Sequence, residues 1–130
     1  MAIAKLDAIP QFVSLLRHGS TNAQRHAAGA LWQLATTADN KNTMVNSGGI
    51  DALVGILLAP DDIVNSTRQV LTKEAAAAVL AELSRSQNTF KVAIANAGGI
   101  KPLIELMGCD IPGAQKQAAS AIWGMACEPK

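Results

Sequence analysis

Two histidines and two cysteines are the residues of this chain that could hold a metal ion or act as nucleophiles. His18 and His26 lie eight residues apart, without a cysteine or carboxylate beside them at the spacing of a zinc site. Neither Cys109 nor Cys127 has a histidine or basic partner in the sequence that would mark a reactive thiolate. We therefore expect no metal, no cofactor and no covalent catalysis.

Two glycine pairs, Gly48-Gly49 and Gly98-Gly99, could in principle approach a phosphate group. Neither pair follows an expected strand, and neither matches the spacing of a phosphate-binding loop. Asp61-Asp62 comes directly after a proline and predicts a turn rather than a catalytic pair of carboxylates. The sequence carries no enzyme signal, so we expect a protein that is not an enzyme.

The composition narrows the classes of partner. The 130 residues suffice for one core, and the 11 basic and 10 acidic residues are interspersed, without a basic stripe that would follow nucleic acid. The longest apolar run, 52–59, falls far short of the roughly 20 residues of a membrane span. The first ten residues contain no export signal, and two cysteines suit a reducing compartment. We expect a cytoplasmic or nuclear protein that binds neither nucleic acid nor membrane.

Apolar residues recur in three units, which begin at Ile9, Ile50 and Ile100. Each isoleucine is followed by apolar residues at +3, +4, +6 and +7, the spacing of one broad helix face. These residues are Phe12, Val13, Leu15 and Leu16; Leu53, Val54, Ile56 and Leu57; Leu103, Ile104, Leu106 and Met107. The distance along the chain from Ile50 to Ile100 is longer than that from Ile9 to Ile50, so the repeat period is not constant.

An alanine-rich block follows each apolar face, at 27–35, 76–84 and 118–126. The block begins at the same distance from the leading isoleucine in the first and third units, but further along the chain from it in the middle unit. The middle unit therefore carries an insertion of about eight residues relative to the common repeat. We expect about half of it to lengthen a helix by one turn, and the rest to form a mobile loop near 61–65.

Each glycine pair stands where one helix ends and the next begins, in "NSGGIDALV" (46–54) and "NAGGIKPLI" (96–104). A glycine just past a helix end adopts the left-handed conformation without a Cβ penalty. The second glycine leaves room for a sharp change of direction. We therefore expect both pairs to form corners between helices.

With these motifs the chain resembles the armadillo repeat family: "GGI-x-x-L-V-x-x-L-L", "A-A-x-A-L-W-x-L-A" and "N-K-x-x-M/I-x-x-x-G-G". The resemblance covers nearly all of one domain, 1–130, in units of about 5–39, 40–86 and 87–127. It implies an all-α, right-handed superhelix of about eight helices. HEAT repeats are the nearest alternative, but they lack the Gly-Gly corner and the three-helix unit.

In the family each unit has a short first helix, then a second and a third, and the third helices line the concave face. Capping boxes at Thr21-x-x-Gln24 and Ser66-x-x-Gln69 support two of the helix starts. The helices that the resemblance implies are 40–47 and 88–97 (first); 5–17, 50–59 and 99–108 (second); and 21–37, 66–84 and 112–127 (third).

Peptide-binding members of the family use asparagines on their third helices, often with a tryptophan one turn earlier. The matching positions here are Gln33, Glu82 and Gly124, with Gly29, Ala78 and Ser120 one turn earlier. Neither ladder is present, which argues against the clamping of an extended peptide in the importin manner. Gln33 retains an amide, and Glu82 offers an acceptor or a partner for a cation.

Trp32 and Trp123 precede the ladder position, where the middle unit has Ala81. We favour core between repeats for both tryptophans, and an aromatic flank for a partner is the alternative. Charged residues of alternating sign are expected at the rim of the groove. The candidate partner-binding residues on the concave third-helix face are Arg25, Gly29, Trp32, Gln33, Glu74, Ala78, Glu82, Lys116, Ser120 and Trp123.

Two functions from different classes follow from the resemblance. The first is a protein-interaction scaffold that binds a protein or peptide through its concave face. The second is a structural segment of a longer solenoid, or a homo-oligomer formed through uncapped ends. The apolar residues expected at those ends are Ile3, Leu6, Phe12, Leu16, Ile122, Trp123 and Met125.

Overall fold

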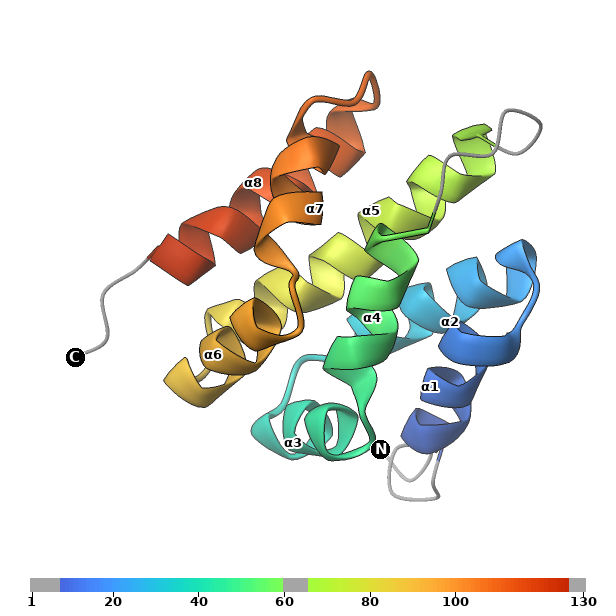
Figure 1. Cartoon of the computed structure of the whole chain (residues 1–130). Helices are drawn as coiled ribbons and strands as arrows, with labels where there is room; N and C mark the ends of the chain where they lie inside the picture. Colours follow the sequence, from blue (N-terminus) through green and yellow to red (C-terminus); the bar gives the residue numbers. More distant parts are fainter. Residues whose placement is uncertain (1–7, 60–65, 127–130) are drawn as a thin grey trace.

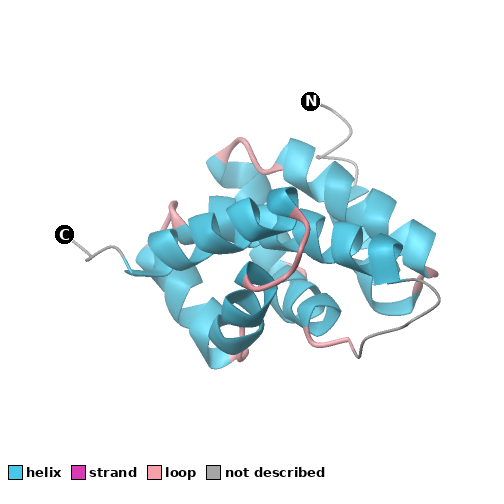
Figure 2. Ribbon diagram, turned by 90° about the horizontal axis from the view of Figure 1, so that it is seen from above, coloured by secondary structure: helices cyan, strands magenta, loops and turns pink. Residues whose placement is uncertain are grey.

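A computed structural model describes residues 8–59 and 66–126, with the side chains of 66–68 left out. This part of the chain forms eight helices and no strand (Figures 1 and 2). The helices are α1 Ile9–His18, α2 Thr21–Leu34, α3 Ala38–Asn46, α4 Gly49–Leu57, α5 Ser66–Ser84, α6 Asn88–Asn96, α7 Ile100–Met107 and α8 Pro112–Ala126. The expectation of an all-α chain with about eight helices is confirmed.

The helices follow one another in a repeated order. We call α1–α2 the first unit, α3–α5 the second and α6–α8 the third. Their third helices, α2, α5 and α8, have 14, 19 and 15 residues, so the middle one is longer by about one turn. The expected bounds agree with the structure within a few residues. The expected helix start at residue 5 and the expected loop at 61–65 lie outside the described residues.

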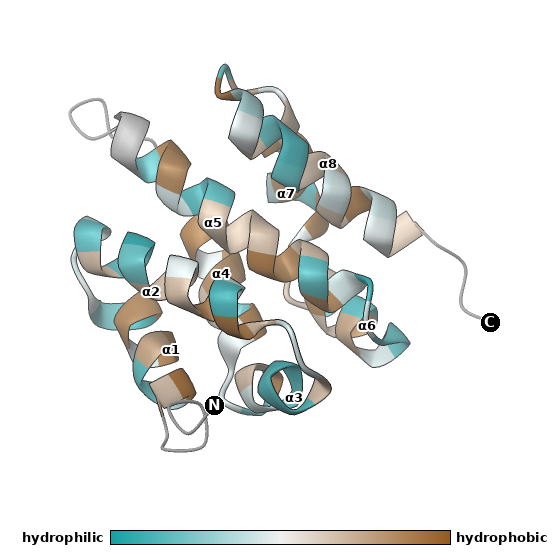
Figure 3. Cartoon of the chain, turned by 180° about the vertical axis from the view of Figure 1, so that it is seen from behind, coloured by the Kyte–Doolittle hydropathy of each residue, from teal (hydrophilic) through white to brown (hydrophobic). Residues whose placement is uncertain are grey.

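The third helices pack side by side, with α5 between α2 and α8 (Figure 1). The second helices α1, α4 and α7 pack against them, and the short α3 and α6 complete the second and third units. The middle of α5 is an alanine run, 75–78, which is buried. Small side chains allow helix axes to approach closely, so α5 can contact neighbours on both sides. In contrast, α3 is mostly hydrophilic and buries only Met44 (Figure 3).

The glycine pairs form the expected corners. Gly48 and Gly98 have φ angles of 82° and 83°, in the left-handed region. A Cβ atom on Gly49 would lie 2.6 Å from the Met44 carbonyl oxygen, and one on Gly99 would lie 2.8 Å from Ile94 Cγ2. The first glycine of each pair is thus required by its φ angle, and the second by lack of space.

The start of α2 differs from the expected capping box. Its N-cap is Ser20, whose hydroxyl accepts a hydrogen bond of 3.2 Å from the Ala23 amide. The prediction of Thr21 as the cap was therefore wrong by one residue. Gln24 does not reach back to the cap but donates through Nε2 to the Leu16 carbonyl, at 2.9 Å, and so ties α2 to α1. The second expected cap, at Ser66, lies outside the described side chains.

Candidate partner-binding surface

The third helices carry all ten candidate residues, and we call the layer that they form the α2–α5–α8 surface. Gln33 is exposed there, and Gly29 is partly exposed. Ala78 is only 1% exposed, because α5 is covered on both sides by its neighbours. The prediction that Ala78 contacts a partner was therefore wrong.

Both tryptophans project outward. Trp32 is 40% exposed and Trp123 is 69% exposed, so the interpretation of these side chains as core between repeats was wrong. For Trp32 the physical reason is its place on the helix, since the neighbouring Leu31 fills the core and is fully buried. Trp32 lines a hollow of about 250 Å³ together with Gln33 and Thr36. The aromatic-flank alternative thus fits the structure better.

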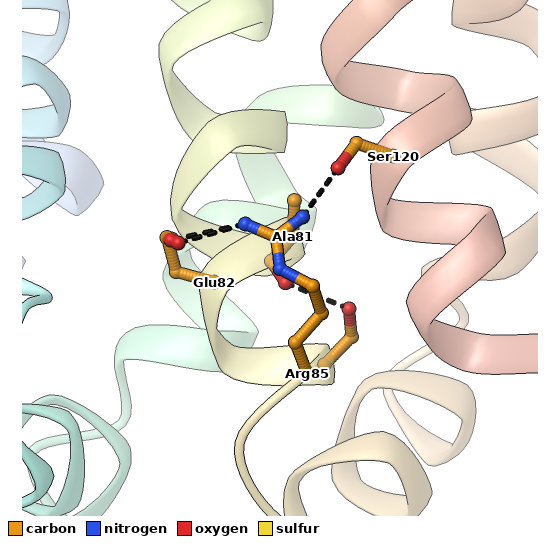
Figure 4. Close-up of polar contacts among 5 residues, drawn as sticks. Ala81, Glu82, Arg85 and Ser120 are labelled. Carbon is orange, nitrogen blue, oxygen red and sulfur yellow. Dashed lines mark hydrogen bonds and ion pairs between the residues drawn. The ribbon is translucent and has the colours of Figure 1, made fainter. Parts of the chain in front are cut away.

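A polar cluster joins α5 to α8 (Figure 4). Arg85 donates from Nη2 to both carboxylate oxygens of Glu82, at 2.7 and 3.0 Å, and from Nη1 to Ser120 Oγ, at 2.5 Å. Ser84 Oγ donates to the Ala81 carbonyl at 2.9 Å. Arg85 was not among the sequence candidates, although its i, i+3 spacing from Glu82 is a signal for such a pair. The carboxylate of Glu82 is therefore already engaged within the chain.

Glu74 also contacts α8 rather than standing at a rim. A Cβ atom on Gly113 would lie 2.7 Å from Glu74 Oε2, so the carboxylate sits against the first turn of α8. A negative charge near the N-terminus of a helix is stabilising. Of the two basic rim candidates, Lys116 is exposed and Arg25 is partly exposed.

The residues that could bind a metal ion or act as nucleophiles lie outside this surface cluster. His18 and His26 are both exposed, and Cys109 is a partly buried free thiol. Within 8–59 and 66–126, no three histidine, cysteine or acidic residues are grouped so as to hold a metal ion. The helices of these ranges include none with the length and apolarity needed to cross a membrane.

A family model for the Armadillo/beta-catenin-like repeat matches residues 1–36 and 88–126. The chain belongs to the armadillo repeat family. Among curated proteins, this armadillo chain is similar to plakophilin-3 of Bos taurus, with 41% identity over 58 residues, 44% of this chain and 7% of the relative. It is also similar to the splicing regulator ARVCF of Rattus norvegicus, with 38% identity over 72 residues, 54% of this chain and 7% of the relative. The armadillo chain thus spans about 7% of the length of these relatives.

Solved structures place the armadillo chain in the same fold. An engineered protein solved by crystallography has a TM-score of 0.78 and 27% identity, over 89% of this chain and 44% of that one. A designed armadillo repeat protein in complex with a (KR)4 peptide has a TM-score of 0.80 and 19% identity, over 95% of this chain and 48% of that one. These neighbours confirm the expected armadillo solenoid.

The armadillo chain departs from the asparagine ladder for a structural reason at one position. A Cβ atom on Gly124 would collide with Ser84 Oγ and would lie 3.3 Å from Arg85 Cγ. No side chain fits there while α5 and α8 keep their present distance. The lack of a ladder side chain at Gly124 thus goes with the close approach of Ser84 and Arg85 in this armadillo chain.

Proposed function

We propose that the chain is a non-catalytic interaction module that binds a partner protein or peptide on the α2–α5–α8 surface, with Trp32 as the anchor. The proposal includes a cytoplasmic or nuclear setting, and partners that are proteins rather than nucleic acids or membranes. The interspersed charge of the sequence supports this choice, because a phosphate-binding face needs clustered cations.

The observation that carries the proposal is the hollow beside Trp32. A partly exposed tryptophan next to a concave site can accept an apolar side chain, and an amide and a hydroxyl beside it, from Gln33 and Thr36, can bond a backbone. Tryptophan is also enriched among the residues that contribute most to binding at protein interfaces.

The Arg85 cluster bears on the kind of segment that binds. The designed relative was solved with an alternating Lys-Arg peptide. Here Glu82 is already paired with Arg85, so a basic peptide would have to displace that arginine. We therefore expect a partner with apolar and neutral side chains over α2 and α5, which binds more tightly than (KR)4.

The experiment selects peptides from a random display library on the whole chain and measures their affinity for the parent and two variants. Trp32→Ala should weaken the selected peptides at least about 10-fold, the loss typical of an interface anchor. Leu58→Ala is the matched control, because Leu58 is a 60% exposed apolar residue on another helix end, and it should change nothing. Peptides that bind Trp32→Ala as tightly as the parent would contradict the proposal.

A second candidate function is favoured by a separate observation at the C-terminal end of the stack. Ile104 and Trp123 of the third unit are 51% and 69% exposed, and these side chains would suit contact with a further unit or with another copy. At the first unit, Leu16 was also expected among the apolar residues of an uncapped end. It is buried within the chain, so it offers no surface to a further unit or another copy. On this second candidate the chain is a structural or self-associating part of a longer solenoid.

A further inference from the structure

We propose that one edge of the stack is a second binding surface, which takes two basic side chains of one extended segment of a partner protein. The surface consists of two hollows of about 380 Å³ each: the first hollow lies between α1, α2 and α4, and the second hollow lies between α5 and α7. Both lie along the edge where the second helices end and the third helices begin (Figure 1). The inference goes beyond the proposed function and does not depend on Trp32.

The two hollows are built from the same positions of consecutive units. Each is lined by a residue of one third helix and by residues of the second helix of the following unit, among them the pairs Gln24 and Lys73, Ala52 and Pro102, and Ile56 and Leu106. The members of the last two pairs are buried and give each hollow an apolar floor. A floor that recurs at consecutive units suits a ligand whose side chains recur along its own length.

Each hollow also carries one carboxylate, from Asp51 in the first hollow and from Glu105 in the second. Both residues are exposed, and among the residues that the structure describes neither has an ion-pair or hydrogen-bond partner. Glu82 of the α2–α5–α8 surface differs, because it is paired with Arg85. A free carboxylate beside an apolar floor is complementary to a basic side chain, whose aliphatic stem packs on the floor while its charge binds the carboxylate.

The basic residues of the hollows are already bound to the backbone of the chain. In the first hollow, Arg17 donates from Nη2 to the Gly48 carbonyl at 3.0 Å. In the second hollow, Lys73 donates from Nζ to the Ala59 carbonyl at 3.1 Å. These bonds leave the two carboxylates to a ligand. A guanidinium and an ammonium group each have further donors, which can bond the backbone carbonyls of that ligand.

The distance between the hollows selects the spacing of the two basic side chains. Helices that pack side by side have axes about 8–10 Å apart, so hollows one repeat apart are separated by about that distance. Three residues of a polyproline II helix advance about 9 Å and bring side chains i and i+3 to the same side. In a β-strand, by contrast, side chains three residues apart point to opposite faces. The segment that we infer is therefore a polyproline II stretch with basic residues at i and i+3.

The test measures the affinity of the peptide acetyl-Lys-Pro-Pro-Lys-amide for the whole chain by NMR titration. Asp51→Asn and Glu105→Gln should each weaken binding about 5-fold, the upper range for an exposed ion pair. Asp39→Asn is the matched control and should change nothing, because Asp39 is an exposed carboxylate of α3 that lines neither hollow. The peptide acetyl-Lys-Pro-Lys-Pro-amide has the same charge at another spacing, and it should bind the parent chain as weakly as the first peptide binds either hollow variant.

A further variant moves the carboxylate within the first hollow. Gly55 holds the position that Glu105 holds in the second hollow, and a Cβ atom on Gly55 would meet nothing within 4 Å. Gly55→Glu added to Asp51→Asn should therefore restore most of the lost affinity for acetyl-Lys-Pro-Pro-Lys-amide. The absence of any recovery would contradict a cation site in the first hollow.

Four other outcomes would overturn the inference. Equal losses from Asp39→Asn and from the hollow variants would show that binding follows net charge alone. A loss from Trp32→Ala, with none from the hollow variants, would place the peptide on the α2–α5–α8 surface and leave the proposed function standing. Tighter binding of acetyl-Glu-Pro-Pro-Glu-amide than of the lysine peptide would assign recognition to Arg17 and Lys73 instead. The lack of saturable binding by any of these peptides would show that the edge takes no such segment.

Discussion

Gly124 of α8 faces Ser84 of α5 so closely that the two helices leave no room for a Cβ atom. Gly124→Ala should therefore destabilise the chain, because α8 must move away from its largest contact surface. We expect a loss of about 1–3 kcal/mol in the free energy of unfolding, the usual cost of overpacking. Unfolding in urea measures the change.

Gly29→Ala is the matched control for this substitution. Gly29 holds a middle position in α2, one turn before the ladder, and a Cβ atom there would meet nothing within 4 Å. Alanine is better than glycine in a helix interior, by about 0.5–1 kcal/mol. Gly29→Ala should thus leave stability unchanged or raise it. A loss at Gly29 as large as that at Gly124 would show that helix spacing is not the cause.

Gly98 separates conformational strain from crowding. Its φ angle is 83°, and a Cβ atom there would meet nothing within 4 Å. Gly98→Ala should cost about 1–2 kcal/mol, through the left-handed conformation alone. Gly98→Asn should cost less, because asparagine tolerates this region. Equal stability of the parent, Gly98→Ala and Gly98→Asn in thermal unfolding would contradict the strain. Gly55→Ala is the unstrained control, because a Cβ atom at Gly55 of α4 would meet nothing within 4 Å.

Trp123 should contribute little to stability in this chain. It is 69% exposed, so Trp123→Ala should change the free energy of unfolding by about 0.5 kcal/mol or less, as is usual for a surface substitution. Leu80→Ala, at a fully buried residue of α5, should cost about 2–5 kcal/mol. Comparable losses for the two variants would restore the interpretation of Trp123 as core.

The ion pair between Arg85 and Glu82 should be weak. Its side chains are 45% and 28% exposed, and pairs at such sites contribute about 0.2–1 kcal/mol. A double-mutant cycle with Arg85→Ala and Glu82→Ala measures the coupling, which should shrink in 1 M salt as screening increases. A coupling above this range that salt does not change would indicate a buried pair instead.

The sequence was sufficient to predict where the helices lie. Apolar spacing and the glycine pairs mark where α4 and α7 begin, because a helix corner requires residues without side chains. The sequence could not decide which of two adjacent hydroxyl residues, Ser20 or Thr21, caps α2, since both offer the same oxygen. Local spacing alone therefore predicts that a helix is present, but it leaves the first residue of the helix uncertain by one position.

The candidate surface was harder to predict, because its contacts join different helices. A shift of one position rotates a side chain by about 100° around a helix, so Trp32 projects outward while Leu31 is buried. The contact from Arg85 to Ser120 joins residues far apart in the sequence and depends on how closely α5 and α8 approach. Ala78 is buried, and its burial likewise depends on how the helices pack rather than on local spacing.

The central place of α5 has a consequence for how the molecule opens. In the described part of the chain, α5 contacts α2 on one side and α8 on the other, so each end of the stack can separate while α5 keeps its other neighbour. Units of a solenoid are stabilised mainly by the units beside them. Amide protons in the middle of α5 should therefore exchange with solvent only when the whole chain unfolds. Those of α1 and α7 should exchange earlier, through separate partial openings.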